Sequence, residues 1–310
     1  MRPRLIREVP NDDLLPVVAG PGPGQLRLRL FDDWLLPAGE LDLPALDPRL
    51  RFAPLPGHTG SLIAAGDEVL LVERDGTVRW RRREDPDPEY PEQATPYVDP
   101  GGTLWLWLPG KEDRIAVVDP ATGDRLAEYA DGENSYGVAV FSHGSPAFFA
   151  HPGGDWTGLH VAAGDQGSTS FRVRYADGRI TAHEFLGEAL AGFDTNGTRY
   201  LAAHHDDEEF AMRSFPDGEV LASCALDDIP GYQAGGPYRI DYGAFMINDD
   251  LVLACVEGDG IAEDVLLSSH TLHWVDTVRY PSASGLPWRS ARPGHWLTRG
   301  SDATRLWALP

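Results

Sequence analysis

The sequence is poor in lysine, in cysteine and in long apolar runs. Lys111 is its single lysine, and only two of its 310 residues are cysteines. Two cysteines cannot build a disulfide framework or a thiolate zinc site, so we expect Cys224 and Cys255 to be free, buried thiols. No apolar run reaches the roughly 18 residues that a membrane-spanning helix needs. Residues 1–20 lack the apolar stretch and cleavage site of a secretory signal, so we expect a soluble, cytoplasmic chain without membrane contact.

Positive charge is also scarce. The chain has 48 acidic residues against 26 basic ones, a formal net charge of −22. A nucleic-acid-binding protein needs a basic surface that displaces counterions from phosphate. Here the densest basic cluster, Arg79 to Arg83, runs directly into the acidic segment 84–92. We therefore expect an acidic protein with no nucleic-acid partner. Hydrophobic residues still make up 42% of the chain, which is enough for a folded core.

The motifs of several enzyme classes are missing. The sequence has no Walker loop, HExxH, GxSxG, CxxC or complete GxGxxG. We therefore predict no cofactor and no metal site. Aspartates do recur in short turns, where a carboxylate accepts hydrogen bonds from nearby backbone, and we interpret them as structural. These turn aspartates are Asp67, Asp113, Asp165, Asp207, Asp259 and Asp302.

What the sequence has in abundance is glycine and proline, 34 and 26 residues, which weigh against a helical fold. Many of the glycines separate two alternating apolar runs, the pattern of a β-hairpin. Examples are VLLVERDGTVRW at 69–80 and IAVVDPATGDRLAEY at 115–129. The turn glycines are Gly39, Gly76, Gly123, Gly178 and Gly218. Their mean spacing is about 45 residues, within the roughly 40–50 residues of a propeller blade.

A further strand pattern precedes each hairpin, so four strands, a to d, recur along the chain. We predict an all-β fold, a seven-bladed β-propeller of four-stranded antiparallel blades that forms one domain over 1–310. The segment 286–310 holds only three strands, and residues 4–9 supply its outer strand, which closes the ring. Six blades remain an alternative if 1–50 contributes only a closing strand. The predicted blades are 11–46, 50–86, 95–131, 136–186, 190–226, 241–281 and 286–310.

The repeats resemble those of the WD40-like and quinoprotein-like propeller superfamily over nearly the whole chain. The strand pattern, the aspartate in the b–c turn and hairpins such as VVDPATGD and RSFPDGEV carry this resemblance. The Trp-Asp dipeptide of WD40 repeats is absent from the matching hairpins. Gly-His occurs only at Gly57-His58 and Gly294-His295. The resemblance implies a fold, and no ligand or partner is carried over with it.

Four polar residues fall at equivalent places when the predicted blades are aligned. His151 and His204 end strand b of blades 4 and 5, and Glu257 and Arg299 end strand b of blades 6 and 7. The b–c and d–a loops of a propeller share one face, so these residues are predicted to form an arc there. Because histidine and glutamate can exchange protons near neutral pH, the four residues are our candidates for catalysis.

Other residues are candidates for ligand binding on the same face. Pro152 to Trp156 form an insertion after His151, His205 lies in a dense polar cluster, and the loop 227–238 holds two tyrosines. The predicted ligand-binding residues are Asp155, Trp156, His205, Tyr232, Tyr238 and Trp288. In contrast, Trp105 and Trp107 are predicted to pack between blades. The acidic, proline-rich loop 84–96 is a candidate for docking a protein.

Two functions remain open at this point. The first is a monomeric binding module that presents loops on one face to a protein or a small ligand. The alternative is an enzyme of the lyase, cyclase or hydrolase type that acts on a small molecule at the mouth of the channel. A polar pocket lined by the candidate residues favours a small ligand, whereas an apolar patch on a flat face favours protein docking.

Overall fold

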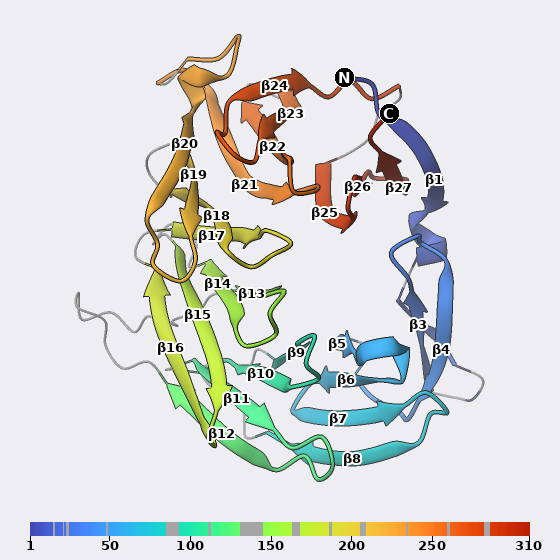
Figure 1. Cartoon of the computed structure of the whole chain (residues 1–310). Coiled ribbons are helices and arrows are strands. Elements are labelled where there is room, and N and C mark those ends of the chain that lie inside the picture. The colour runs from blue at the N-terminus through green and yellow to red at the C-terminus, as the bar shows by residue number, and fades with distance from the viewer. Residues whose placement is uncertain are drawn as a thin grey trace. The chain divides into compact units, whose positions relative to one another are not determined.

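The computed structural model describes residues 1–14, 16–20, 22, 25–47, 49–84, 93–110, 113–130, 145–162, 168–185, 188–204, 209–233, 235–258, 261–281 and 286–310. Within these ranges the regular structure is β-strand, apart from short 3-10 turns such as η1 (Asn11–Leu14), η2 (Pro56–His58) and η4 (Leu226–Asp228) (Figure 1). No α-helix occurs in the described residues, so none there could cross a membrane.

Seven antiparallel sheets follow one another along the chain as the blades of a β-propeller, each built from consecutive strands. The first four blades have the following strands. Blade 1 has β2 (Val17–Ala19), β3 (Leu26–Phe31) and β4 (Pro37–Leu43); blade 2 has β5 (Leu50–Pro54), β6 (Gly60–Ala65), β7 (Glu68–Glu73) and β8 (Val78–Arg83); blade 3 has β9 (Thr95–Val98), β10 (Leu104–Leu108), β11 (Arg114–Val118) and β12 (Arg125–Ala130); blade 4 has β13 (Ser145–Ala150), β14 (Thr157–Ala162), β15 (Ser168–Ala176) and β16 (Arg179–Phe185).

The remaining three blades follow the same plan. Blade 5 has β17 (Glu188–Phe193), β18 (Arg199–His204), β19 (Glu209–Ser214) and β20 (Val220–Ala225); blade 6 has β21 (Tyr238–Met246), β22 (Leu251–Gly258), β23 (Ile261–Ser268) and β24 (Trp274–Thr277); blade 7 has β25 (Leu286–Arg292), β26 (His295–Arg299), β27 (Ala303–Ala308) and β1 (Arg4–Pro10). The predicted seven-bladed, all-β fold is therefore confirmed, and the six-bladed alternative is wrong.

Blade 1 differs from the prediction of four strands, because its sheet contains only β2, β3 and β4 in the described residues. The segment expected to begin this blade forms η1 instead, and the backbone and side chain of Asn11 donate hydrogen bonds to the carbonyls of Asp302 and Gly300, both at 2.9 Å. These residues are thus committed to the end of blade 7. Gly39 was also misplaced, since it lies inside β4 opposite Leu30 and not in a turn.

The N-terminal strand closes blade 7 as predicted. Strand β1 pairs with β27 from Arg4 opposite Ala308 to Pro10 opposite Ala303. Across this pairing the Nε atom of the buried Arg305 donates a hydrogen bond to a Glu8 carboxylate oxygen at 2.5 Å. The closing strand therefore covers what would otherwise be the free edge of β27.

The other four predicted turn glycines lie in c–d hairpins, with φ between 75° and 85°. Gly123 shows why one of them must be glycine, since a Cβ there would lie 2.6 Å from the Trp80 ring. Between blades 3 and 4, Trp105 and Trp107 are fully buried in a cluster that includes Phe171 and Val173 of β15. The prediction that these two tryptophans pack between blades is confirmed.

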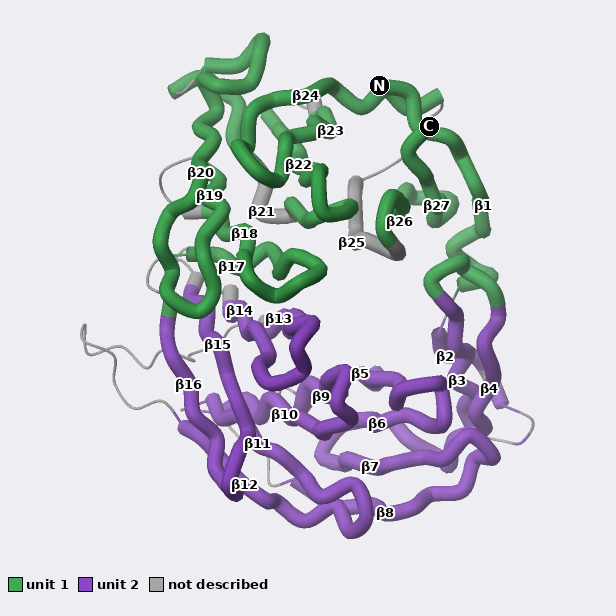
Figure 2. The backbone as a smooth tube through the Cα atoms, viewed as in Figure 1, with its two compact units in different colours: residues 1–14, 33–36, 185–310 green, residues 15–32, 37–184 purple. Residues whose placement is uncertain are grey.

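Contacts divide the chain into two compact units (Figure 2). The first comprises residues 1–14, 33–36 and 185–310, and the second comprises 15–32 and 37–184. The division falls inside the β3–β4 turn and before the last residue of β16, not in a linker. The single domain over 1–310 stays a prediction.

Candidate functional site

The turn after the first strand of several blades is held by one side chain that accepts backbone hydrogen bonds. In blade 3 the buried Asp99 accepts from the Thr103 amide at 2.9 Å and from the Trp105 indole at 3.0 Å. In blade 5 the buried Asp194 accepts from the amides of Thr198 and Arg199 at 2.8 and 3.1 Å. These carboxylates fix their turns locally.

His151 occupies the same place in blade 4. It follows β13, the first strand of its sheet, and its Nδ1 accepts a hydrogen bond from the Gly153 amide at 3.1 Å. The assignment of His151 to the end of strand b was therefore wrong: AFFA forms strand a. The insertion that follows it became the a–b loop, because TGLHVA provides the second strand.

The other three catalytic candidates do end strand b of their blades. His204 is the last residue of β18, Glu257 lies next to last in β22, and Arg299 is the last residue of β26. Glu257 accepts hydrogen bonds from Arg239 of β21, at 2.8 Å from Nε and 2.6 Å from Nη2. His151 belongs to the other compact unit, and its grouping with these three stays a prediction.

Two predicted tyrosines lie together, Tyr232 in the loop before blade 6 and Tyr238 at the start of β21. The rings of Tyr232 and Tyr238 meet edge to face with centroids 5.2 Å apart, and the Tyr232 hydroxyl donates a hydrogen bond to Glu263. Burial, followed by the adjacent Glu263 carboxylate, raises the Tyr232 pKa above its ordinary value. Both tyrosines are therefore partly buried groups with contacts of their own.

Some candidates lie outside what can be described. His205, most of the loop 84–96, and the side chains of His204 and Trp288 fall outside the part of the chain that the structure describes. Among the described residues, no group of three His, Cys, Asp or Glu side chains has the arrangement of a metal site. The turn aspartate Asp113 accepts from the Gly110 amide at 2.8 Å, a structural contact. Burial raises the pKa of the Cys224 thiol to about 12, so it is protonated at neutral pH.

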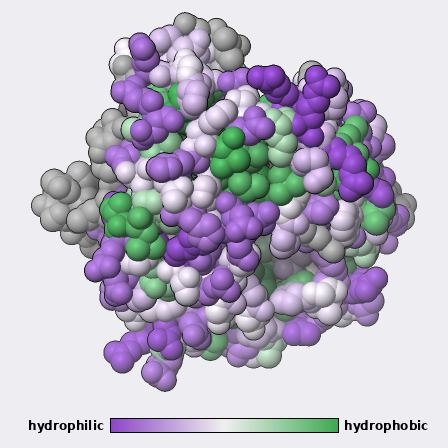
Figure 3. All heavy atoms as spheres, turned by 45° about the horizontal axis from the view of Figure 1, so that its top comes forward, coloured by the Kyte–Doolittle hydropathy of each residue, from purple (hydrophilic) through white to green (hydrophobic). Residues whose placement is uncertain are grey.

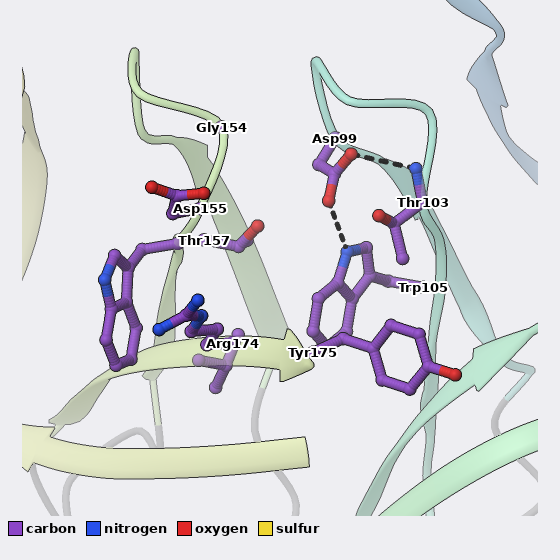
Figure 4. Close-up of a pocket in the computed structure, with 10 residues that line it drawn as sticks. Asp99, Thr103, Trp105, Gly154, Asp155, Thr157, Arg174 and Tyr175 are labelled. Carbon is purple, nitrogen blue, oxygen red and sulfur yellow. Dashed lines mark hydrogen bonds between the residues drawn. The ribbon is translucent and has the colours of Figure 1, made fainter. Parts of the chain in front are cut away.

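A polar cavity of about 100 Å³ opens between blades 3 and 4, inside the second unit (Figure 4). Its blade 3 side is the a–b turn from Asp99 to Thr103 together with Trp105 of β10. Its blade 4 side is the loop 154–156, Thr157 at the start of β14, and residues 173–175 of β15. Figure 4 shows the two loops standing opposite each other, with Asp155 on one and Asp99 on the other, and Arg174 on the strand that passes below.

The charged groups of this cavity differ in how they are held. Arg174 is exposed, and its guanidinium carbon lies 5.8 Å from the centroid of the Trp156 ring, within cation–π range. Arg172 lies over the same ring at 5.3 Å, and His183 of β16 packs at 5.9 Å. The indole of Trp156 is thus half-buried among its neighbours, where it positions Arg174. Its predicted stacking on a ligand stays a prediction.

Asp155 and Trp156 were predicted as ligand-binding residues, and the structure places both at this cavity. Sequence reasoning missed Arg174 and Asp99. The alternation along β15 indicates that Arg172 and Arg174 share one face, which was the available signal for Arg174. Nothing in the sequence pairs the blade 3 turn with the blade 4 loop, because their meeting depends on how two sheets pack.

Comparisons with known proteins identify the fold and go no further. No protein-family model matches the chain, and no curated protein matches its sequence. The β-propeller domain of Cps50 (Swd1) from Myceliophteria thermophila is 11% identical with a TM-score of 0.61, covering 99% of this chain and 100% of that one. BamB from Moraxella catarrhalis is 11% identical with a TM-score of 0.53, covering 99% and 100%. The periplasmic gluconolactonase PpgL of Pseudomonas aeruginosa is 13% identical with a TM-score of 0.55, covering 93% and 89%.

These similarities define the class of protein: a β-propeller with the architecture shared by WD40 and quinoprotein-like propellers. At 11–13% identity they show the fold alone. One of the similar structures is named as a lactonase and another as a β-propeller domain, so fold does not choose between catalysis and binding.

Proposed function

We propose that this chain is a binding module and that its recognition site is the cavity between blades 3 and 4. The observation that carries the proposal is the convergence of two loops and one strand on a polar cavity with opposite charges, Asp155 and Arg174. Loops held by a rigid β-scaffold are the usual place for binding in such folds. The cytoplasmic location and the monomeric state belong to the same proposal.

The distribution of exposed apolar residues favours a polar ligand over protein docking on a flat face. The exposed large apolar residues of the described chain lie mainly on outer strands: Leu5, Leu126, Val220, Leu221, Trp274 and Val275. None of these lines the cavity. Figure 3 likewise shows hydrophilic side chains over most of the visible face, with apolar residues in limited patches.

The enzyme alternative retains three of its four predicted residues. His204, Glu257 and Arg299 keep equivalent positions at the ends of b strands, but His151 caps a turn of another blade. A histidine pair was the core of the catalytic hypothesis, so the binding module is now favoured. Glu257 provides a variant that tests this alternative directly.

Ligand-observed NMR with a panel of small polar metabolites tests the proposed function. Compounds bound by the wild type should be lost in Trp156→Leu, because the indole that positions Arg174 is removed. The Trp274→Leu variant should still bind them, because it removes an exposed tryptophan of β24 that does not line the cavity. Binding that survives Trp156→Leu, or that depends on Glu257→Gln instead, would contradict the proposal.

A further inference from the structure

The cavity between blades 3 and 4 holds two opposite charges that do not neutralise each other. Asp155 and Arg174 both line it, yet no ion pair joins them and neither has another ion-pair partner among the described residues. Several arginines on strands of the described chain pair closely with carboxylates, as Arg114 does with Glu128 at 3.1 Å. What sets Arg174 apart is its place: it lines a cavity that an aspartate unpaired among the described residues also lines.

A contact with an aromatic ring holds the arginine at the cavity. Its guanidinium rests on the Trp156 ring, which in turn contacts Arg172 and His183. A cation–π contact of this kind holds the guanidinium near the ring and leaves its N–H groups for another acceptor. Those N–H groups match the two oxygens of a carboxylate in bidentate geometry.

The carboxylates of the cavity are not equivalent. Both oxygens of Asp99 are used, one by the Thr103 amide and the other by the Trp105 indole, so this residue is a structural part of the wall. Asp155 is exposed at the opposite loop, with no hydrogen bond of its side chain among the described residues. The charge available to a ligand on that side is therefore negative, and it suits an ammonium group.

Size and net charge narrow the ligand further. A cavity of about 100 Å³ is small for a ligand site, since drug-sized ligands occupy pockets of about 300–1,000 Å³. A simple anion would meet Asp155 and the field of a chain with a net charge of −22, and a simple cation would meet Arg174. A small molecule with both charges meets neither objection.

We infer that this cavity binds a small zwitterion of the α-amino-acid class, with its carboxylate on Arg174 and its ammonium group on Asp155. The inference rests on the proposed binding function of the same site and adds the class of ligand. Thr103 and Thr157 supply hydroxyl groups at the cavity for the remaining polar atoms of the ligand. The small volume selects glycine, alanine or serine over larger members of the class.

The test compares matched probes on the full chain by isothermal titration calorimetry. Alanine carries both charges, alaninamide lacks the carboxylate, and N-acetylalanine lacks the ammonium group. The affinity for alanine should be about ten-fold or more higher than the affinity for either derivative, because each derivative loses one charge-assisted contact. Glycerol tests a neutral polyol of similar size, and the dipeptide alanylalanine tests whether a longer zwitterion fits.

Variants link any binding to the two named side chains. Arg174→Gln and Asp155→Asn should each weaken alanine binding about ten-fold or more. The matched controls are Arg179→Gln and Asp177→Asn, exposed residues of the same charges at the β15–β16 turn that do not line the cavity. The controls should leave affinity unchanged, and circular dichroism should show all four variants folded.

Three results would overturn the inference: equal affinity for alanine and its two derivatives, alanine binding that persists in both cavity variants, or no alanine binding at millimolar concentration. A different set of results tests the proposed binding function of the cavity. If metabolites of the NMR panel bind in a Trp156-dependent way while alanine does not, the site is a binding site for another ligand. If neither depends on the cavity residues, both proposals fail.

Discussion

At the residue scale, the turn that follows the first strand of a blade explains why His151 was misinterpreted. Asp99, Asp194 and His151 follow their strands directly, Asn248 stands one residue later, and each accepts a backbone hydrogen bond from its own turn. Any short acceptor can serve this purpose, so the residue type varies while the contact persists. A histidine in this position resembles a catalytic group in the sequence, and only the structure shows its Nδ1 engaged with Gly153.

Asp194 gives a prediction for the dependence of stability on pH. Burial by itself would raise the Asp194 pKa, but hydrogen bonds from Arg199 and Thr198 outweigh it and hold the pKa below its ordinary value of 3.8. A carboxylate with a lowered folded-state pKa contributes stability that is complete above its unfolded value and is lost as the pH falls through the folded value. The free energy of unfolding should therefore decline on acidification below about pH 4.

Asp194→Asn isolates this contribution. The variant should lose about 1–3 kcal/mol of unfolding free energy at neutral pH, because buried donors lose a charged acceptor. Below about pH 4 its deficit relative to the wild type should shrink, since the wild-type carboxylate is then protonated. Urea titrations between pH 3 and 7 measure both effects, with the exposed Asp177→Asn as the control. A deficit that stays constant over this range would show that the charge of Asp194 is unimportant.

At the scale of elements, hairpins could be located from the sequence more reliably than the strands before them. A c–d hairpin combines period-two alternation with a glycine of positive φ, as at Gly76 and Gly178. Strand a has no such turn signal. Because no turn marks strand a, AFFA in blade 4 was assigned to strand b. In the structure AFFA belongs to β13, which pairs with β14 as the first strand of its sheet.

The closing strand β1 gives a prediction at this scale. Deleting residues 1–10 removes a pairing of six positions with β27 and the Glu8 contact of the buried Arg305. The free energy of unfolding should fall by roughly 5 kcal/mol, because each ladder hydrogen bond contributes about 1 kcal/mol. Urea denaturation measures this, and Leu5→Ala, at an exposed side chain of the same strand, should change it by less than about 0.5 kcal/mol.

The freed edge of β27 should also make the truncated chain self-associate as its concentration rises, since unpaired strand edges recruit other strands. Light scattering detects this association. A truncated chain with the wild-type midpoint and no association would show that blade 7 does not need the N-terminal strand.

At the scale of the whole molecule, the acidic charge is partly used by the fold. Several of the described arginines on outer strands pair with carboxylates, as Arg81 does with Glu68 and Arg125 with Glu84. Turn aspartates such as Asp113 accept local hydrogen bonds. The net charge of −22 is therefore weak evidence for a cationic partner, and the local charges of one cavity are the better guide.

We also predict that the chain unfolds as one domain. The division between its two compact units passes through β16 and through the β3–β4 turn, so each unit contains part of an element whose remainder belongs to the other. A boundary between independent domains lies in an exposed linker instead. Differential scanning calorimetry should give one transition with equal calorimetric and van't Hoff enthalpies, and two separate transitions would contradict the prediction.

The sequence by itself determined the all-β class and the N-terminal closing strand, and it favoured seven blades over six. Alternation and turn glycines are local features, and they repeat often enough to count. The tertiary structure alone decided the role of His151 and the cavity that joins Asp155 to Arg174 beside the Asp99 turn. The reason is physical: side chains from residues 99 to 175 meet there only after two sheets pack around Trp105, and that packing leaves no periodic trace in the chain.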